Sequence, residues 1–210
     1  MTKGLRRFGI VFVVSGPSGT GKSTICRKVL QDDSNLKFSV SCTTRPPREG
    51  ENDGVDYYFI SKNKFRDHIK QNAFIEHAEV HEELYGTLRS EVEDCIKIGR
   101  DILLDIDVQG VARIQGQEEE ELWTQCVQYI FFAPPSLGEL ERRLRGRGTE
   151  SETRILSRLN AGDLEMKNWK NYNYLLINFN ISDSVKKLQS IIQAERLKTS
   201  RIINKEPWKS

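Results

Sequence analysis

The chain has 210 residues, a length that suits one globular unit with small insertions. Its 32 basic residues nearly cancel its 30 acidic ones, and the formal net charge is +2. This balance argues against general affinity for nucleic acids or membranes, so any anion must be bound by locally placed Arg and Lys side chains. Apolar residues make up 37% and charged residues 30%, a composition typical of a soluble protein, and we expect a cytoplasmic location.

The apolar run near the N-terminus predicts a buried strand. Residues 10–14 form a run of only five apolar residues that leads directly into a glycine-rich segment, so they do not suit a signal peptide. No apolar stretch approaches the roughly 20 residues needed to cross a bilayer. The four cysteines are scattered without a CxxC pair, which favours reduced thiols.

The order of apolar runs and helical patterns predicts an α/β fold with a parallel core sheet flanked by helices. Runs that are apolar almost throughout are typical of strands covered on both faces. We expect core strands at residues 10–14, 102–106, 129–133 and 174–177. Helical patterns follow three of these strands, at residues 22–30, 137–145 and 184–198, which is the alternation of a doubly wound sheet.

Two segments interrupt this alternation. Within residues 36–100, short alternating stretches at 38–41, 57–60 and 76–80 are mixed with helical patterns at 62–71 and 90–97. Residues 136–172 are arginine-rich and helical in pattern, with Gly146 and Gly148 as a predicted hinge. We therefore expect a core domain of residues 1–40, 101–135 and 173–210, a mixed α/β subdomain of residues 41–100, and a helical segment of residues 136–172.

Residues 16–23 read Gly-Pro-Ser-Gly-Thr-Gly-Lys-Ser and fit the pattern G-x-x-x-x-G-K-[ST] in full. A predicted strand precedes them and a predicted helix follows, which is the context this loop needs. The glycines let backbone N–H groups turn toward one anion. Lys22 would reach the β- and γ-phosphates of a nucleoside triphosphate, and Ser23 would offer its hydroxyl to Mg²⁺. The alternative is a glycine-rich turn before a helix.

Two acids stand at the end of the second predicted core strand. Asp105 and Asp107 are two positions apart, so on a strand they would point the same way. Acids at the end of an apolar strand are costly unless a cation or donor lies nearby. They predict a carboxylate on the magnesium side of the phosphate site, with a structural role such as a helix cap as the alternative.

Two arginines flank a rigid Pro-Pro turn. Arg45 and Arg48 are three apart, and the extended turn would let both guanidinium groups converge on one phosphate. The alternative is a solvated basic loop.

A second group of arginines occupies residues 142–158. Arg147 and Arg158 are eleven positions apart, which is three helical turns. Arginines on a mobile lid would supply positive charge to a transferring phosphoryl group and exclude water. We expect Arg142 and Arg145 to be ordinary surface charge.

Taken in order, these motifs make the chain resemble guanylate kinase over about residues 8–195. The resemblance rests on Ser15-Gly-Pro-Ser-Gly-Thr-Gly-Lys-Ser-Thr, Ser41-Cys-Thr-Thr-Arg-Pro-Pro-Arg, Gly54-Val-Asp-Tyr-Tyr-Phe, Phe74-Ile-Glu, Tyr85-Gly-Thr, Leu104-Asp-Ile-Asp-Val-Gln-Gly, Ala133-Pro-Pro-Ser and Arg147-Gly-Thr-Glu.

The resemblance implies a P-loop kinase that transfers the γ-phosphoryl group of ATP to GMP with Mg²⁺. Residues 41–100 would then be a GMP-binding subdomain and residues 136–172 a lid. A carboxylate suits guanine because it accepts from the N1–H and N2–H₂ groups, which adenine lacks. The implied GMP-binding residues are Ser41, Arg45, Arg48, Tyr57 and Tyr85 at the phosphate, with Glu76, Thr87 and Asp105 at the guanine edge.

On the donor side, the resemblance implies an ATP site that also takes in one residue near the adenine base. The implied ATP-binding residues are Gly16, Pro17, Ser18, Gly19, Thr20, Gly21, Lys22, Ser23, Thr24 and Asn178. The implied catalytic residues are Lys22, Arg45, Arg143, Arg147 and Arg158, and the implied magnesium-binding residues are Ser23 and Asp107.

The chain departs from the family pattern in two places. After Asn178, where the family usually carries acids, the run is Phe-Asn-Ile-Ser-Asp, and the tail from about Thr199 has no counterpart, so we expect it to be frayed or docked. Two alternatives stay open: a non-catalytic peptide-binding scaffold, which the intact phosphate loop disfavours, and a kinase for another nucleoside monophosphate. His68, His77 and His81 lack metal-like spacing, and the oligomeric state is open between monomer and homodimer.

Overall fold

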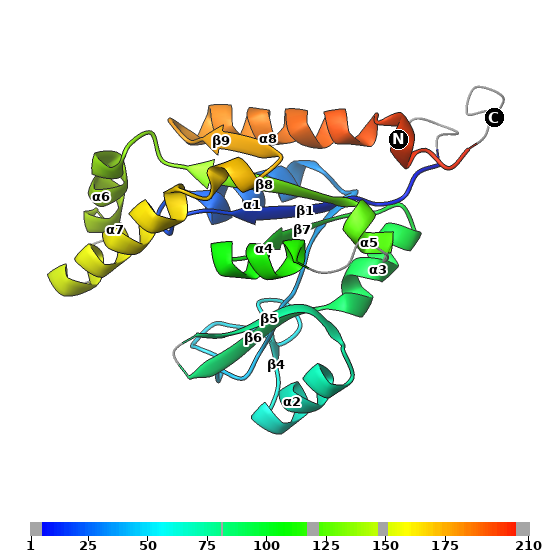
Figure 1. The fold of residues 1–210 in the computed structure, drawn as a ribbon, viewed down its shortest axis with the longest axis horizontal. Helices are drawn as coiled ribbons and strands as arrows, with labels where there is room; N and C mark the ends of the chain where they lie inside the picture. The colour runs from blue at the N-terminus through cyan, green and yellow to red at the C-terminus, as the bar shows by residue number, and fades with distance from the viewer. Residues whose placement is uncertain (1–5, 81, 117–121, 147–150, 205–210) are drawn as a thin grey trace.

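The computed structural model describes residues 6–80, 82–116, 122–146 and 151–204 and has a five-stranded parallel sheet at its centre (Figure 1). The strand order is β2 (Leu36–Phe38), β7 (Asp101–Asp105), β1 (Val11–Ser15), β8 (Val127–Ala133) and β9 (Tyr174–Ile177). Each neighbouring pair is parallel. The predicted parallel core sheet is thus confirmed.

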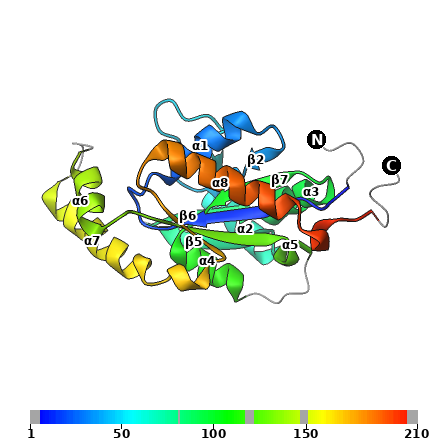
Figure 2. The ribbon, with the colours of Figure 1, turned by 90° about the horizontal axis from the view of Figure 1, so that it is seen from above.

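Helices cover both faces of this sheet, which explains why its strands are apolar throughout. Helices α1 (Lys22–Asp32) and α8 (Ile181–Arg196) lie side by side on one face (Figures 1 and 2). Their side chains pack on Phe12 and Val14 of β1. The other face carries α3 (Arg89–Lys97), α4 (Val108–Gln115) and α5 (Leu122–Gln125), which pack on Val11 and Val13. Alternate residues of one strand thus serve two cores.

A second, four-stranded sheet lies beyond α3 and α4 (Figure 1). Its order is β4 (Tyr58–Phe59), β3 (Cys42–Thr43), β6 (Glu83–Leu88) and β5 (Phe74–Val80). Strands β5, β6 and β3 are antiparallel neighbours, and β3 pairs with β4 in parallel. Helix α2 (Lys62–Lys70) closes its small core, in which the Phe65 and Phe74 ring centroids are 4.5 Å apart.

A helical pair forms one end of the molecule (Figures 1 and 2). Helix α6 (Leu137–Arg145) is capped by Ser136, whose hydroxyl accepts from the Glu139 amide at 3.1 Å. Its buried Leu140 and Leu144 pack on Ile155 of α7 (Glu152–Met166), and the short helix η1 (Trp169–Asn171) leads back to the core sheet. None of the described helices has the length and apolar character needed to cross a membrane.

One predicted strand is wrong. Of the alternating stretch at residues 38–41, only Phe38 belongs to a strand: it ends β2 and pairs with Leu103, and β3 begins at Cys42. Residues 39–41 form the crossing between the two sheets, which local alternation does not reveal. Strand β6 was also missed, because a glycine-containing segment is a weak strand signal. Gly148 of the predicted hinge lies outside the described residues. The division into three domains stays a prediction.

The two ends of the described chain are joined through a buried carboxylate. Asp101 is fully buried at the start of β7 and accepts from Arg7 at 2.7 and 2.8 Å, from Arg196 at 2.7 Å and from the Ile10 amide at 3.0 Å. Arg196 also pairs with Asp33 at 2.7 Å. This network links the N-terminal segment to α1 and α8.

The tail is docked as far as the structure describes it. Helix η2 (Thr199–Arg201) places the buried Arg201 guanidinium 2.6 Å from Glu195, and Ile202 forms an antiparallel bridge with Arg7. The Ile203 amide donates to the Arg6 carbonyl at 2.9 Å. Of the two expectations for the tail, frayed or docked, the structure therefore shows docking through residue 204.

We predict that Asp101→Asn destabilises the protein by about 3–5 kcal/mol, because it removes the buried counter-charge of Arg7 and one of the two carboxylates that pair with Arg196. Urea unfolding followed by circular dichroism measures the change. Asp67→Asn is the matched control: Asp67 pairs with Lys70 at an exposed site on α2, and its loss should change the free energy of unfolding by no more than about 0.5 kcal/mol. Equal effects of the two substitutions would contradict the assigned role of Asp101.

Candidate active site

The loop between β1 and α1 has the backbone conformation that cradles a phosphate. Gly16 and Gly21 have φ values of +129° and +91°, in the left-handed region that favours glycine. A Cβ at Gly16 would lie 2.1 Å from the Phe132 carbonyl oxygen, and one at Gly21 would lie 2.6 Å from Asn178 Nδ2. Only glycine fits at either position. The loop leads directly into the N-terminus of α1, whose free N–H groups favour an anion.

Asn178 holds this loop in place from the side of α8. It is 1% exposed, its Nδ2 donates to the Thr20 carbonyl at 2.6 Å, and its Oδ1 accepts from Ser184 at 2.9 Å. Its side chain thus joins the phosphate loop to α8. It does not line the phosphate pocket described below, and the predicted contact with an adenine base stays a prediction.

The phosphate pocket is a cavity of about 350 Å³ above this loop. The Lys22 ammonium donates to the Gly16 carbonyl at 2.5 Å, so it lies over the loop. Its predicted contact with the β- and γ-phosphates stays a prediction. The loop residues that line the cavity are Gly16, Ser18, Gly19, Thr20, Gly21, Lys22, Ser23 and Thr24, joined by Asp105, Ile106, Asp107 and Glu165. Pro17, the remaining residue of the predicted loop, instead packs beside Gly162 of α7.

Asp105 and Asp107 both face the pocket, but they do not lie on one strand. Strand β7 ends at Asp105, and Asp107 caps α4, where its Oδ1 accepts from the Gly110 amide at 2.6 Å. The structural alternative therefore holds for Asp107 without removing it from the pocket lining. Loss of solvation among the surrounding protein atoms raises the pKa of the Asp105 carboxyl, and the Lys22 charge opposes part of that rise.

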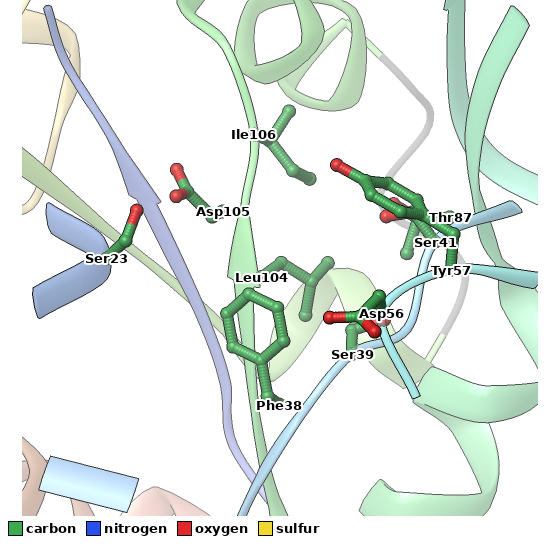
Figure 3. A pocket seen from close by; sticks show the side chains of 10 residues that line it. All are labelled: Ser23, Phe38, Ser39, Ser41, Asp56, Tyr57, Thr87, Leu104, Asp105 and Ile106. Atoms are coloured by element: carbon green, nitrogen blue, oxygen red, sulfur yellow. The ribbon is translucent and has the colours of Figure 1, made fainter. Parts of the chain in front are cut away.

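A second cavity of about 220 Å³ shares Ser23, Asp105 and Ile106 with the phosphate pocket. Figure 3 shows Ser23 and Asp105 on one side of it and Ser41, Tyr57 and Thr87 on the other. The second group comes from the small sheet and the loops next to it, so the cavity lies between the two sheets. Three more of the predicted acceptor residues, Ser41, Tyr57 and Thr87, are thus placed together with Asp105.

Arg45 lies beside this cavity in an aromatic cradle. Its guanidinium carbon is 5.5 Å from the Tyr57 ring centroid and 5.7 Å from that of Phe59. The Tyr57 ring in turn meets the Tyr85 ring edge-on at 6.0 Å. Glu51 accepts from Arg45 Nη2 at 2.9 Å, and this bond raises the pKa of Arg45 further above its usual value.

Arg48 is less closely tied to the cavity. Its backbone amide donates to Glu51 Oε2 at 2.7 Å, so the same carboxylate orders both predicted arginines. The Arg48 side chain is exposed and does not line the second cavity. The sequence reasoning missed Glu51 as a partner of these arginines. An acid three residues after Arg48 could have indicated it.

Glu76 reaches the second cavity through Thr87. The Thr87 hydroxyl donates to Glu76 Oε1 at 2.9 Å across the β5–β6 pair. Glu76 Oε2 also lies near Gly110: a Cβ built there would be 3.2 Å from this oxygen. Burial raises the pKa of Glu76, and the Thr87 hydrogen bond and Arg113 oppose the rise.

The arginines of α6 and α7 lie outside both cavities in the described structure. Arg143 donates to the Asn178 carbonyl at 2.9 Å and to Glu139 at 2.7 Å, which places it behind the phosphate loop. Arg158 lies on α7 and is partly exposed, and Arg147 falls outside the described residues. Arg142 and Arg145 make exposed ion pairs with glutamates, as expected for surface charge. The catalytic roles of Arg143, Arg147 and Arg158 stay predictions.

Glu165 is a pocket residue that the sequence reasoning missed. It stands in the last turn of α7 and lines the phosphate pocket together with Lys22 and Asp107. No motif marks it, because its position depends on how α7 packs against the loop.

The raised pKa of Glu76 predicts a pH-dependent stability. The folded state keeps the Glu76 proton to a higher pH than the unfolded chain, so the contribution of this proton to the free energy of unfolding is full below pH 4.5 and is lost as the pH rises. Since Gln cannot titrate, Glu76→Gln should gain stability relative to the wild type between about pH 4 and pH 7. Chemical denaturation across this range measures the difference, with exposed Glu79→Gln of the same strand as a control that should show no such trend. A flat difference for Glu76→Gln would contradict the prediction.

Comparison with known proteins places this site in a family. The guanylate kinase family model matches residues 9–195. The guanylate kinase of Clostridioides difficile (strain 630) is 43% identical over 93% of this chain and 93% of its own length. That of Zymomonas mobilis subsp. mobilis is 44% identical over 95% and 90%, respectively. The crystal structure of guanylate kinase from Anaplasma phagocytophilum matches with a TM-score of 0.74 and 33% identity, over 95% of this chain and 93% of that one. The chain therefore belongs to the guanylate kinase family, and the resemblance seen in its motifs is confirmed.

Proposed function

We propose that the protein transfers the γ-phosphoryl group of ATP to GMP and yields ADP and GDP. The observation that carries this proposal is the pair of adjoining cavities that share Ser23 and Asp105. One cavity is built on a phosphate loop, and the other is lined by hydroxyl groups and by the carboxylates of Asp56 and Asp105, from the two sheets and the segments next to them. Two sites with a common wall suit direct transfer between two bound nucleotides, without a covalent enzyme intermediate.

The donor site would act through positioning and charge. The backbone N–H groups of the loop and the Lys22 ammonium would hold the β- and γ-phosphates. An oxygen of the GMP phosphate then bonds to the γ-phosphorus, the bond from that phosphorus to the β–γ bridging oxygen breaks, and ADP keeps the bridging oxygen. Arg45, Arg143, Arg147 and Arg158 are proposed to offset the charge on the equatorial oxygens.

The pocket has the donor chemistry for Mg²⁺. A hydroxyl and two carboxylates, from Ser23, Asp105 and Asp107, line it next to Lys22, and oxygen ligands are those that Mg²⁺ prefers. Ser23 and Asp107 are the residues proposed to hold it. When bound, the ion would neutralise charge on the β- and γ-phosphate oxygens.

The acceptor site would recognise GMP at both ends. Glu76, Thr87 and Asp105 are proposed to read the guanine edge, where a carboxylate accepts from two donors that adenine lacks. The GMP phosphate would be held by a set of hydroxyls and guanidinium groups, namely Ser41, Arg45, Arg48, Tyr57 and Tyr85. The proposal further includes a cytoplasmic location, small-molecule substrates alone, and a monomer or homodimer.

An acceptor panel tests the proposal. Purified protein with ATP and Mg²⁺ is given GMP, dGMP, AMP, UMP or TMP, and ADP release is followed in a coupled assay. We expect turnover of GMP far above that of AMP, UMP and TMP. Soluble, folded protein that does not turn over GMP would overturn the proposed function, and a preference for another base would favour a different monophosphate kinase.

Glu76→Gln should weaken the selectivity for GMP. The amide offers one acceptor and turns a donor toward the guanine N2–H₂ group, so a charged hydrogen bond worth about 1.5–3 kcal/mol is lost. We expect kcat/KM for GMP to fall about 10- to 100-fold, while that for AMP does not fall. Glu79→Gln, on the same strand but exposed, should leave both values unchanged. An unaltered ratio of GMP to AMP in Glu76→Gln would refute the assignment of Glu76 to the guanine.

A further inference from the structure

Helix α7 packs directly on the phosphate loop. At Gly162, a Cβ would come within 2.9 Å of Leu140 Cδ2 and 3.5 Å of Pro17 Cβ, so the bare helix backbone lies against the loop. Gly19 of the loop faces the same helical pair, since a Cβ there would be 3.0 Å from Leu144 Cδ2. These contacts fix the distance of α7 from the loop.

Glu165 follows Gly162 by three residues, so the two lie on the same side of α7. That side turns the Glu165 carboxylate into the phosphate pocket, whose lining also includes Lys22, Ser23, Asp105 and Asp107. The end of α7 lies next to the start of α4, where Asp107 stands (Figures 1 and 2). Three carboxylates from three separate elements therefore face one cavity.

Glu165 differs from other acids of its helix. Within the part of the chain that the structure describes, its carboxylate forms no hydrogen bond or ion pair, whereas Asp163 pairs with Lys167 at 3.7 Å and Glu152 with Arg145 at 2.5 Å. An unpaired carboxylate beside a triphosphate would repel it. Burial raises the pKa of Glu165 and the Lys22 charge opposes part of that rise. The Lys22 ammonium and a cation brought by the bound donor can therefore both offset this repulsion.

Glu165 would reach the cation through water. Among the described residues, no group of three His, Cys, Asp or Glu side chains is close enough to bind a metal ion directly. Mg²⁺ usually keeps several water molecules when it binds to a nucleotide site, and a second-sphere carboxylate accepts hydrogen bonds from them. Glu165 fits that position, since it lines the pocket next to Ser23 and Asp107.

We propose that Glu165 is a positioning residue of the donor site, which accepts hydrogen bonds from metal-bound water and so makes the protein prefer Mg²⁺–nucleotide over free nucleotide. This inference rests on the proposed function, because it assumes a magnesium–nucleotide complex at the phosphate loop. Helix α7 would then help to distinguish metal-bound from metal-free nucleotide, in addition to supplying positive charge through its arginines.

The test is the affinity for ADP with and without Mg²⁺, measured by isothermal titration calorimetry on the full chain. The coupling factor is the dissociation constant without Mg²⁺ divided by the dissociation constant with Mg²⁺. Glu165→Gln should lower this factor about tenfold, through weaker binding with Mg²⁺ and equal or tighter binding without it. Asp163→Asn, an exposed acid on the same helix, should keep the wild-type factor.

Thermal unfolding of each unliganded variant checks that it is folded. Glu165→Asp keeps the negative charge and should have a coupling factor between those of Glu165→Gln and the wild type. An unchanged coupling factor in Glu165→Gln would overturn the inference. So would an equal loss of affinity with and without Mg²⁺, because that result would assign Glu165 to holding Lys22. A wild-type protein that binds no ADP with Mg²⁺ would overturn the proposed function as well, whereas normal wild-type binding with an unaltered variant would overturn the role of Glu165 alone.

Discussion

The parallel register of β1 with its two neighbours is the constraint on which both cavities depend. Val14 pairs with Asp105 of β7, and Ser15 pairs with Phe131 of β8. The loop after β1 and the carboxylate at the end of β7 therefore emerge at the same edge of the sheet, where open α/β sheets bind their ligands. A slip of one residue would turn the apolar side chains of β1 to the wrong cores, so burial on both faces enforces this register.

The arginines show that positive charge is divided between structure and chemistry. Arg7, Arg196 and Arg201 form ion pairs with buried carboxylates, and these pairs join the termini to the core. Arg45 is instead held by Glu51 and two aromatic rings at the side of the second cavity, where an anion can reach it. A guanidinium removed from water needs an anionic or aromatic partner. Whether that partner lies in the core or beside a cavity decides whether the arginine stabilises the fold or is available to an anion.

The phosphate loop is held from two sides. Asn178 bonds to Thr20 from the side of α8, and α6 and α7 pack on Gly19 and Pro17 from the other. Any displacement of the helical pair relative to the core sheet has to break the second set of contacts. The position of these helices and the shape of the loop are thus physically linked, and the same packing brings a carboxylate of α7 to the pocket.

The sequence by itself determined the α/β class, the core strands, the phosphate loop and the family, because each is written in adjacent residues or in a local period. It also indicated Ser41, Tyr57, Thr87 and Asp105, which the fold brings to one cavity. Only the tertiary structure decided that the chain crosses between sheets at residues 39–41, that Asp107 caps a helix, and that Asn178 supports the loop. It also decided that Glu165 enters the donor pocket. These features depend on contacts between residues far apart in the chain, and such contacts leave no local pattern to read.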